Sequence, residues 1–178
     1  DLPLVVQMFR KRRSFPETEQ VWPKASIAKG FINPPEAGLL HRVASTWPVQ
    51  GPVVELGSYE GRSAIVFALA GREVNAVDEW GANPEAMSPD DGYEVKDLFE
   101  RFKRNIAQAG VVARVRTHRG RTSEVGRRWT GGSCAILFLD AGHTYEHARA
   151  DLDAWLPHLA PGGLLLMHDL LCERFPGV

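Results

Sequence analysis

The sequence has only two cysteines, Cys134 and Cys172. Two are too few for a disulfide framework, so we expect a reducing, cytoplasmic setting. No apolar run has the length of a membrane span or the form of a signal peptide, and we expect no membrane partner. The formal net charge of −1 lacks the excess of cations needed to neutralise phosphates, which argues against a nucleic-acid partner. What is present is enough for one buried core, because 44% of the 178 residues are hydrophobic.

Short apolar runs alternate with helical patterns along most of the chain. Strands are expected at residues 53–56, 74–77, 113–118, 135–139 and 164–167, with helices between them. This alternation predicts an α/β fold with a doubly wound parallel sheet.

Two segments lack such a pattern. Residues 1–34 contain four prolines and a basic cluster without a sustained period, so we expect an N-terminal arm or lid outside the core, followed by one domain over residues 35–178. Glu79 to Gly92 is long and unpatterned, and a loop of this length in a compact domain is usually functional. We expect it to cover a crevice.

The first predicted strand leads into a glycine turn of the form E-x-G-x-x-x-G, which starts at Glu55. It lacks the third glycine of the G-x-G-x-x-G turn that seats a dinucleotide pyrophosphate, and Glu55 and Glu60 would repel phosphates there. An acid beside the turn favours a cationic ligand such as S-adenosylmethionine, which carries a sulfonium and an ammonium but no phosphate. Asp78 ends the second strand, where a carboxylate typically accepts hydrogen bonds from the ribose hydroxyls of a bound cofactor. A purely structural turn is the alternative.

Polar residues follow the last two predicted strands, as Asp140 with His143 and as His168 with Asp169. Because the carboxyl ends of neighbouring parallel strands meet at one edge, we expect these side chains in one crevice, where they would suit a divalent cation. Two alternatives stay open. Asp140 could cap the following helix, where its charge would favour the helix dipole. His147 could join Asp140 and His143 in a different metal cluster.

From residue 36 to residue 169 the chain resembles the class I S-adenosylmethionine-dependent methyltransferases. Within them it resembles the small bacterial metal-dependent O-methyltransferases that modify sugar hydroxyls, the mycobacterial mannoside type included. The resemblance rests on residues 55–63, on V-D-E-W at 77–80, on L-D-A-G-H-T-Y at 139–145 and on P-G-G at 161–163 before His168-Asp169. It implies a Rossmann-like catalytic domain over residues 35–178 with strand order 3-2-1-4-5. The antiparallel strands that end the family's sheet are expected to be absent from residues 1–178.

The resemblance also assigns roles to residues. It implies Asp140, His168 and Asp169 as metal ligands, His143 as the general base, and Asp140 and His143 as the catalytic residues. It implies a cofactor site made of Glu55, Gly57, Ser58, Gly61, Ser63, Asp78, Glu79, Arg121, Thr122 and Asp140. In relatives the last ligand pair is Glu-Asp or Asp-Asn, so His168 departs from both patterns. Mg²⁺ and Mn²⁺ both remain candidates, and nitrogen ligation favours Mn²⁺.

The expected function is transfer of a methyl group from S-adenosylmethionine to a sugar hydroxyl with the help of a divalent metal. The expected partners are a small-molecule or oligosaccharide acceptor and further copies of the chain in a homo-oligomer. Three alternatives remain: a small-molecule or catechol-type O-methyltransferase, a non-catalytic module that binds S-adenosylmethionine, and a nicotinamide-dependent oxidoreductase, which the missing third glycine disfavours.

Overall fold

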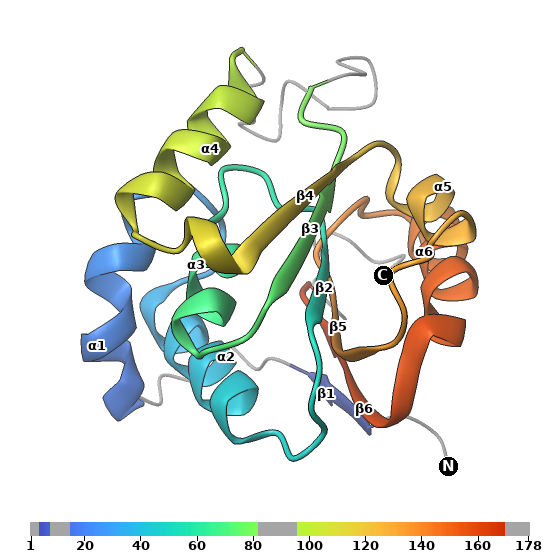
Figure 1. Cartoon of the computed structure of the whole chain (residues 1–178), viewed down its shortest axis with the longest axis horizontal. Coiled ribbons are helices and arrows are strands. Elements are labelled where there is room, and N and C mark those ends of the chain that lie inside the picture. The colour runs from blue at the N-terminus through green and yellow to red at the C-terminus, as the bar shows by residue number, and fades with distance from the viewer. Residues whose placement is uncertain (1–3, 8–14, 82–95, 170–178) are drawn as a thin grey trace.

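The computed structural model describes residues 4–7, 15–81 and 96–169, which form a parallel sheet with helices on both faces (Figure 1). The strands are β1 (Leu4–Gln7), β2 (Val53–Leu56), β3 (Val74–Asp78), β4 (Val115–Arg119), β5 (Cys134–Leu139) and β6 (Leu159–Met167). The helices are α1 (Pro16–Ala25), α2 (Pro34–Thr46), α3 (Arg62–Leu69), α4 (Leu98–Gln108), α5 (Thr122–Arg127) and α6 (Tyr145–Trp155), with 3₁₀ turns η3 (Val112–Arg114) and η4 (Leu156–His158).

The sheet order is β1-β6-β5-β2-β3-β4, and every pairing in it is parallel. Numbered from β2, the five expected strands lie in the order 3-2-1-4-5, so the predicted fold class and strand order are confirmed. β1 was not expected. It adds a sixth described strand at the edge beside β6, within a segment that has no periodic pattern of apolar residues.

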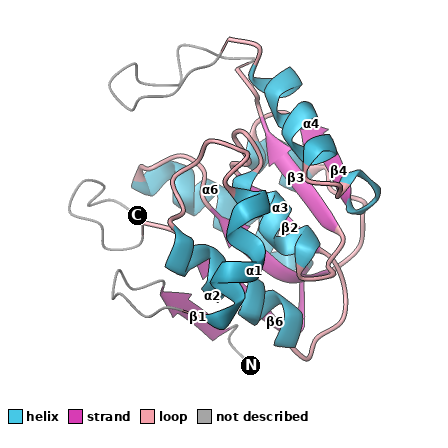
Figure 2. Cartoon of the chain, turned by 90° about the vertical axis from the view of Figure 1, so that its left-hand side faces the viewer, coloured by secondary structure: helices cyan, strands magenta, loops and turns pink. Residues whose placement is uncertain are grey.

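Helices cover the two faces of the sheet unequally. α1, α2, α3 and α4 lie over one face, with the first three in front of the sheet in Figure 2, and α5 and α6 lie over the other. Successive side chains of a strand point to opposite faces, so Ile136 and Phe138 of β5 join the core beneath the first group, while Leu137 and Leu139 join the core beneath the second. Strands buried on both sides explain the continuous apolar runs in the sequence.

Residues 15–33 contribute four side chains to the core, contrary to the expectation of an arm outside it. Val21, Ala25, Ala28 and Ile32 are buried in the same cluster as β5. The prolines disfavoured a helix in this part of the sequence. Pro16 nevertheless lies in the first turn of α1, where its missing N–H breaks no hydrogen bond of the helix. The boundary between residues 34 and 35 stays a prediction.

Part of the loop expected to cover the crevice, residues 82–92, lies outside the described residues, as does Cys172. Cys134 is a buried free thiol, and burial raises its pKa to about 12. Among the described helices, none has the length and apolar character needed to cross a membrane.

Candidate active site

The functional residues expected from the sequence lie where parallel strands end at one edge of the sheet. Leu56 of β2 is in register with both Val77 of β3 and Leu139 of β5, and Leu139 is in register with Met167 of β6. The residues that follow these positions therefore leave the sheet at the same level, which places Asp78, Asp140 and His168 along one edge. This is the arrangement expected for an open α/β sheet.

The glycine turn between β2 and α3 depends on two residues without side chains. Gly57 has a φ of +86°, and a Cβ there would collide with the backbone of Asp140. Gly61 has a φ of +94°, and a Cβ would lie 3.0 Å from the ring of Phe102. Both glycines are thus required by left-handed backbone and close packing. Their role in binding a cofactor stays a prediction.

Glu55 places an acid beneath this turn. It is fully buried, and its Oε2 accepts a hydrogen bond from the Ser58 hydroxyl at 2.6 Å. Its Oε1 is buried with no hydrogen-bond partner among the described residues. Burial raises the pKa of Glu55 to about 7, although Ser58 and Ser63 lower it in part. The turn therefore keeps a carboxyl group that a cationic ligand or a water molecule would stabilise.

Asp78 fastens the glycine turn to β3. Its Oδ2 accepts the backbone N–H of Tyr59 at 2.8 Å, and its Oδ1 accepts that of Trp80 at 2.6 Å. Burial raises the pKa of Asp78, whereas these hydrogen bonds lower it. Backbone N–H groups of Ser58 and Glu79 also lower this pKa, and the expected contact of Asp78 to ribose stays a prediction. The backbone carbonyl of the neighbouring Glu79 accepts a hydrogen bond from the Arg119 guanidinium.

An open pocket lies beside the glycine turn. Four expected residues line it, namely Gly57, Ser58, Ser63 and Asp140. Tyr59 and Arg62, which belong to the expected glycine turn, also line it, together with four residues that had no sequence signal, namely Lys29, Gly30, Phe31 and Ile32. The other six expected cofactor residues do not line this pocket, and they are Glu55, Gly61, Asp78, Glu79, Arg121 and Thr122. Of these, Arg121 and Thr122 lie at the start of α5.

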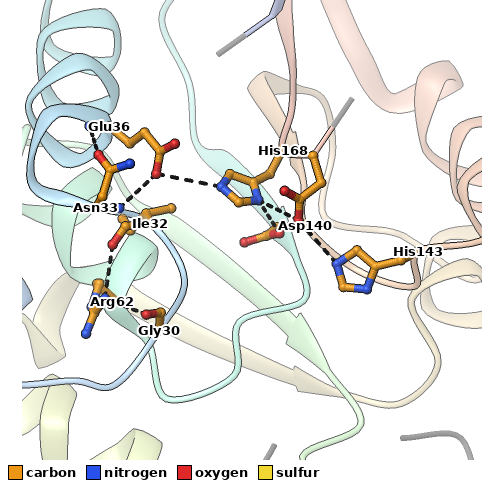
Figure 3. Close-up of polar contacts among 9 residues, drawn as sticks. Gly30, Ile32, Asn33, Glu36, Arg62, Asp140, His143 and His168 are labelled. Carbon is orange, nitrogen blue, oxygen red and sulfur yellow. Dashed lines mark hydrogen bonds and ion pairs between the residues drawn. The ribbon is translucent and has the colours of Figure 1, made fainter. Parts of the chain in front are cut away.

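Arg62 explains how residues 29–32 are held beside the turn. Its Nε donates to the carbonyl of Ala28 at 2.9 Å, and its Nη1 donates to the carbonyls of Gly30 and Ile32 (Figure 3). Glu60 adds a further anchor, because its Oε2 accepts the backbone N–H of Lys29 at 3.2 Å. A segment without regular structure is thereby fixed as one wall of the pocket.

Asp140 also belongs to a cluster of acidic and histidine side chains (Figure 3). Nδ1 of His168 is 3.2 Å from Oδ1 of Asp140 and 3.0 Å from Oδ2 of Asp169. Nε2 of His143 is 3.6 Å from the same Oδ2 of Asp169. One ligand atom each from Asp140, His143 and Asp169 lies within 4.8 Å of the others, so these residues could hold a metal ion. In this group His143, expected as the general base, stands in place of His168, the ligand that the resemblance implied. The structure thus brings together the four side chains expected in one crevice.

The two alternative roles proposed for this region are not supported by the geometry. Thr144 caps α6, because its side-chain oxygen accepts the backbone N–H of His147, so Asp140 is not the cap. The side chain of His147 is exposed and lies outside the group of Asp140, His143 and Asp169.

Charge is concentrated on the buried His168, which is 9% exposed. Burial opposes its protonation, but Asp140, Asp169 and Glu36 outweigh this effect and raise its pKa to about 12. The two histidines hold the pKa of Asp169 well below its usual range. Nδ1 of His168 has no aligned hydrogen bond among the described residues, although two carboxylates are within 3.2 Å. The carboxylate oxygens of Asp140 and Asp169 therefore converge on one nitrogen of His168, an arrangement that would also suit a metal cation.

Glu36 of α2 completes the cluster from the opposite side and had no sequence signal as a site residue. Its Oε2 is 3.8 Å from Nε2 of His168 (Figure 3). Glu36 is the third residue of α2, after the N-cap Asn33.

Comparison with known proteins decides the family. Residues 54–170, more than half of the chain, match the methyltransferase domain family. The chain belongs to this family. An uncharacterised protein y4gI of Sinorhizobium fredii is 28% identical to this chain over 149 residues, and the match covers 78% of this chain and 16% of that protein. The chain thus spans about a sixth of the length of this relative.

Solved methyltransferases share the fold of this domain. The O-methyltransferase TomG of Streptomyces achromogenes, solved with S-adenosylmethionine, gives a TM-score of 0.61 at 18% identity, covering 90% of this chain and 66% of that one. CalS11, a TDP-rhamnose 3′-O-methyltransferase of calicheamicin biosynthesis, gives 0.56 at 20% identity, covering 89% and 68%. At these identities the likeness concerns the fold.

Proposed function

We propose that this methyltransferase domain transfers a methyl group from S-adenosylmethionine to a sugar hydroxyl with the help of a divalent metal ion. The observation that carries the proposal is the position of Asp140, which lines both the pocket beside the glycine turn and the pocket that contains His143 and His168. A donor in the first pocket and an acceptor in the second would meet at this residue. The names of TomG and CalS11 support the donor and the sugar acceptor.

The residues present fit a divalent metal. Asp140, His168 and Asp169 would hold it, because Nδ1 of His168 faces an oxygen of each carboxylate at 3.2 and 3.0 Å. A bound cation would supply the Lewis acidity that lowers the pKa of an acceptor hydroxyl. Two carboxylates with an imidazole favour Mn²⁺ over Mg²⁺.

His143 would act as the general base. Its side chain is 20% exposed against 9% for His168, so its ring has access both to the cluster and to solvent. An imidazole takes up a proton readily near neutral pH, and such a base contributes roughly 10²- to 10⁴-fold to the rate. Asp169 would stabilise the resulting imidazolium, since its Oδ2 is 3.6 Å from Nε2 of His143.

An aromatic acceptor is the second candidate. Phe31, 52% exposed, lines the pocket beside the turn, and its ring centroid is 5.8 Å from that of Tyr59. This candidate differs from the first in placing the acceptor in the same pocket as the donor, where such a pair would stack on a planar phenol as well as on the apolar face of a sugar.

A transfer assay with labelled S-adenosylmethionine tests the proposal. The acceptors are a panel of monosaccharides, oligosaccharides and catechols, with and without EDTA. We expect sugar methylation that EDTA abolishes and that Mn²⁺ restores at least as well as Mg²⁺. Full activity in excess EDTA, with no metal found by elemental analysis, would contradict the metal site. Transfer to phenols alone would favour the second candidate.

His143→Ala separates a base from a metal ligand. We expect kcat to fall by roughly 10²- to 10⁴-fold, with little change in the affinities for Mn²⁺ and S-adenosylhomocysteine. His147→Ala is the matched control, because His147 is an exposed histidine four residues further on. Recovery of the His143→Ala rate at saturating Mn²⁺ would show that His143 is a ligand.

A further inference from the structure

We infer that Glu36 is a positioning residue that orients His168 and connects the wall of the cofactor pocket to the proposed metal site. The inference rests on the proposed function, because it concerns a ligand of that site. Glu36 contacts neither pocket directly and acts through the imidazole that it faces.

Glu36 has two partners for one carboxylate oxygen. It is the third residue of α2, where its backbone N–H donates to Oδ1 of Asn33 at 3.0 Å. In return its Oε2 accepts the backbone N–H of Asn33 at 2.8 Å, which completes a capping box. The same Oε2 lies 3.8 Å from Nε2 of His168 (Figure 3).

The helix cap does not require the charge of Glu36. A glutamine in this position also accepts the N-cap N–H, so a neutral side chain would serve the cap equally. A carboxylate that is 9% exposed has lost most of its hydration, which is costly unless a cation or a strong donor faces it. The imidazole of His168 is such a partner. The negative charge of Glu36 therefore serves the interaction with His168 rather than the helix cap.

The side from which Glu36 approaches determines how the imidazole presents itself. A carboxylate near Nε2 stabilises an N–H at that nitrogen and leaves Nδ1 facing Asp140 and Asp169. Groups behind a metal-bound histidine fix its ring orientation and tautomer in this way, and their loss typically lowers metal affinity about 10- to 100-fold. Glu36 occupies that place for His168.

Asn33 connects this arrangement to the other pocket. It directly follows residues 29–32, which line the pocket beside the glycine turn and whose carbonyls at Gly30 and Ile32 are held by Arg62. A shift of this segment would move the Asn33 N–H and, with it, the carboxylate that faces His168. A ligand bound in the first pocket would in this way change the position of the carboxylate that faces His168.

Mn²⁺ binding, measured by electron paramagnetic resonance on the whole chain, tests the inference with three variants. Glu36→Gln keeps an acceptor for the cap but removes the charge, and Glu36→Asp keeps the charge on a side chain too short to reach His168. We expect both to weaken Mn²⁺ binding about tenfold or more. Asn33→Ala, the matched control, weakens the cap but leaves the carboxylate in place. It should lower the melting temperature and change Mn²⁺ affinity less than twofold.

The outcomes separate this inference from the proposed function. Mn²⁺ affinity within twofold of wild type in both Glu36 variants would overturn the inference while leaving the metal site intact. A wild-type chain that binds no Mn²⁺ would instead overturn the metal part of the proposed function. The ¹⁵N resonance of His168 Nε2 would then decide the role of Glu36. It should move in Glu36→Gln and stay in Asn33→Ala, and an unchanged resonance in Glu36→Gln would overturn the role.

Discussion

Glu55 shows at the scale of one residue how burial sets the properties of the glycine turn. The carboxyl group is fully buried, and one of its two oxygens accepts a hydrogen bond from the Ser58 hydroxyl. Burial removes the water that would stabilise the ionised form, which raises its pKa from 4.5 to about 7. Glu55 is therefore close to half protonated near neutral pH, before any cationic ligand arrives.

This pKa predicts a pH-dependent effect of Glu55→Gln. The folded protein binds the Glu55 proton more tightly than the unfolded chain does, so stability is lost as the pH rises from about 4.5 through about 7. Glutamine cannot ionise and avoids this loss. We expect the variant to be close to wild type at pH 4.5 and to be more stable by about 3 kcal/mol at pH 8. Urea unfolding at the two pH values measures it.

The control for this prediction is Glu19→Gln, at an exposed glutamate of α1. It should change the free energy of unfolding little at either pH. A Glu55→Gln variant with the same stability difference at both pH values would show that Glu55 has an ordinary pKa in the folded protein.

At the scale of elements, two arginines hold irregular segments by the same device at opposite ends of the sheet. Arg62, the first residue of α3, donates to three carbonyls of residues 28–32 beside the glycine turn. Arg72 donates to four carbonyls, at Ala44, Trp47, Val49 and Gly51, before β2 begins. A guanidinium carries several donors in a fixed plane, so one side chain can replace the regular hydrogen bonds that a loop lacks.

Arg62→Ala should weaken cofactor binding because it releases one wall of the pocket. We expect affinity for S-adenosylhomocysteine, measured by calorimetry, to fall roughly tenfold, and the melting temperature to fall as well. Arg72→Ala is the control, since it removes a similar set of hydrogen bonds away from the pocket. It should lower stability but leave affinity unchanged at a temperature where both variants are folded. Equal loss of affinity in the two variants would show that the effect is general destabilisation.

At the scale of the whole molecule, one core joins the N-terminal helix to the sheet. Val21 and Ala25 of α1 are buried in the cluster that contains Ile136 and Phe138 of β5. A second core lies on the other face of the sheet around Trp155, so the strands of the sheet are shared by both. Elements that share one packed core are expected to unfold together.

Val21→Ala tests this integration. Removal of two buried methyl groups from a side chain that is 1% exposed should lower the free energy of unfolding by about 1 to 3 kcal/mol, with a single transition. Gln20→Ala, an exposed position on the same helix, should have little effect. If the main transition keeps its midpoint in Val21→Ala and α1 melts separately, the N-terminal region is an appended arm after all.

Much of the fold and part of the site could be predicted because the signals were local. Apolar runs between turns marked the five strands, and their alternation with helices predicted a parallel sheet, whereas the order 3-2-1-4-5 was expected from the resemblance to methyltransferases. The positions of Asp140 and His168 directly after strands were enough to bring them to one edge, since parallel strands end together. The turn at Gly57 was equally visible, because a left-handed backbone leaves glycine in the sequence.

Only the tertiary structure decided what surrounds these residues. Glu36 and His168 are separated by most of the chain, and no pattern in either segment indicates that their side chains meet. The carbonyl groups that accept hydrogen bonds from Arg62 belong to residues 28–32. This segment is neither helix nor strand, so its sequence shows no periodic pattern of apolar residues. Local patterns report the face that an element buries, whereas contacts between distant segments depend on how the elements pack against the sheet. For this reason the strand ends were predictable and the groups that orient their side chains were not.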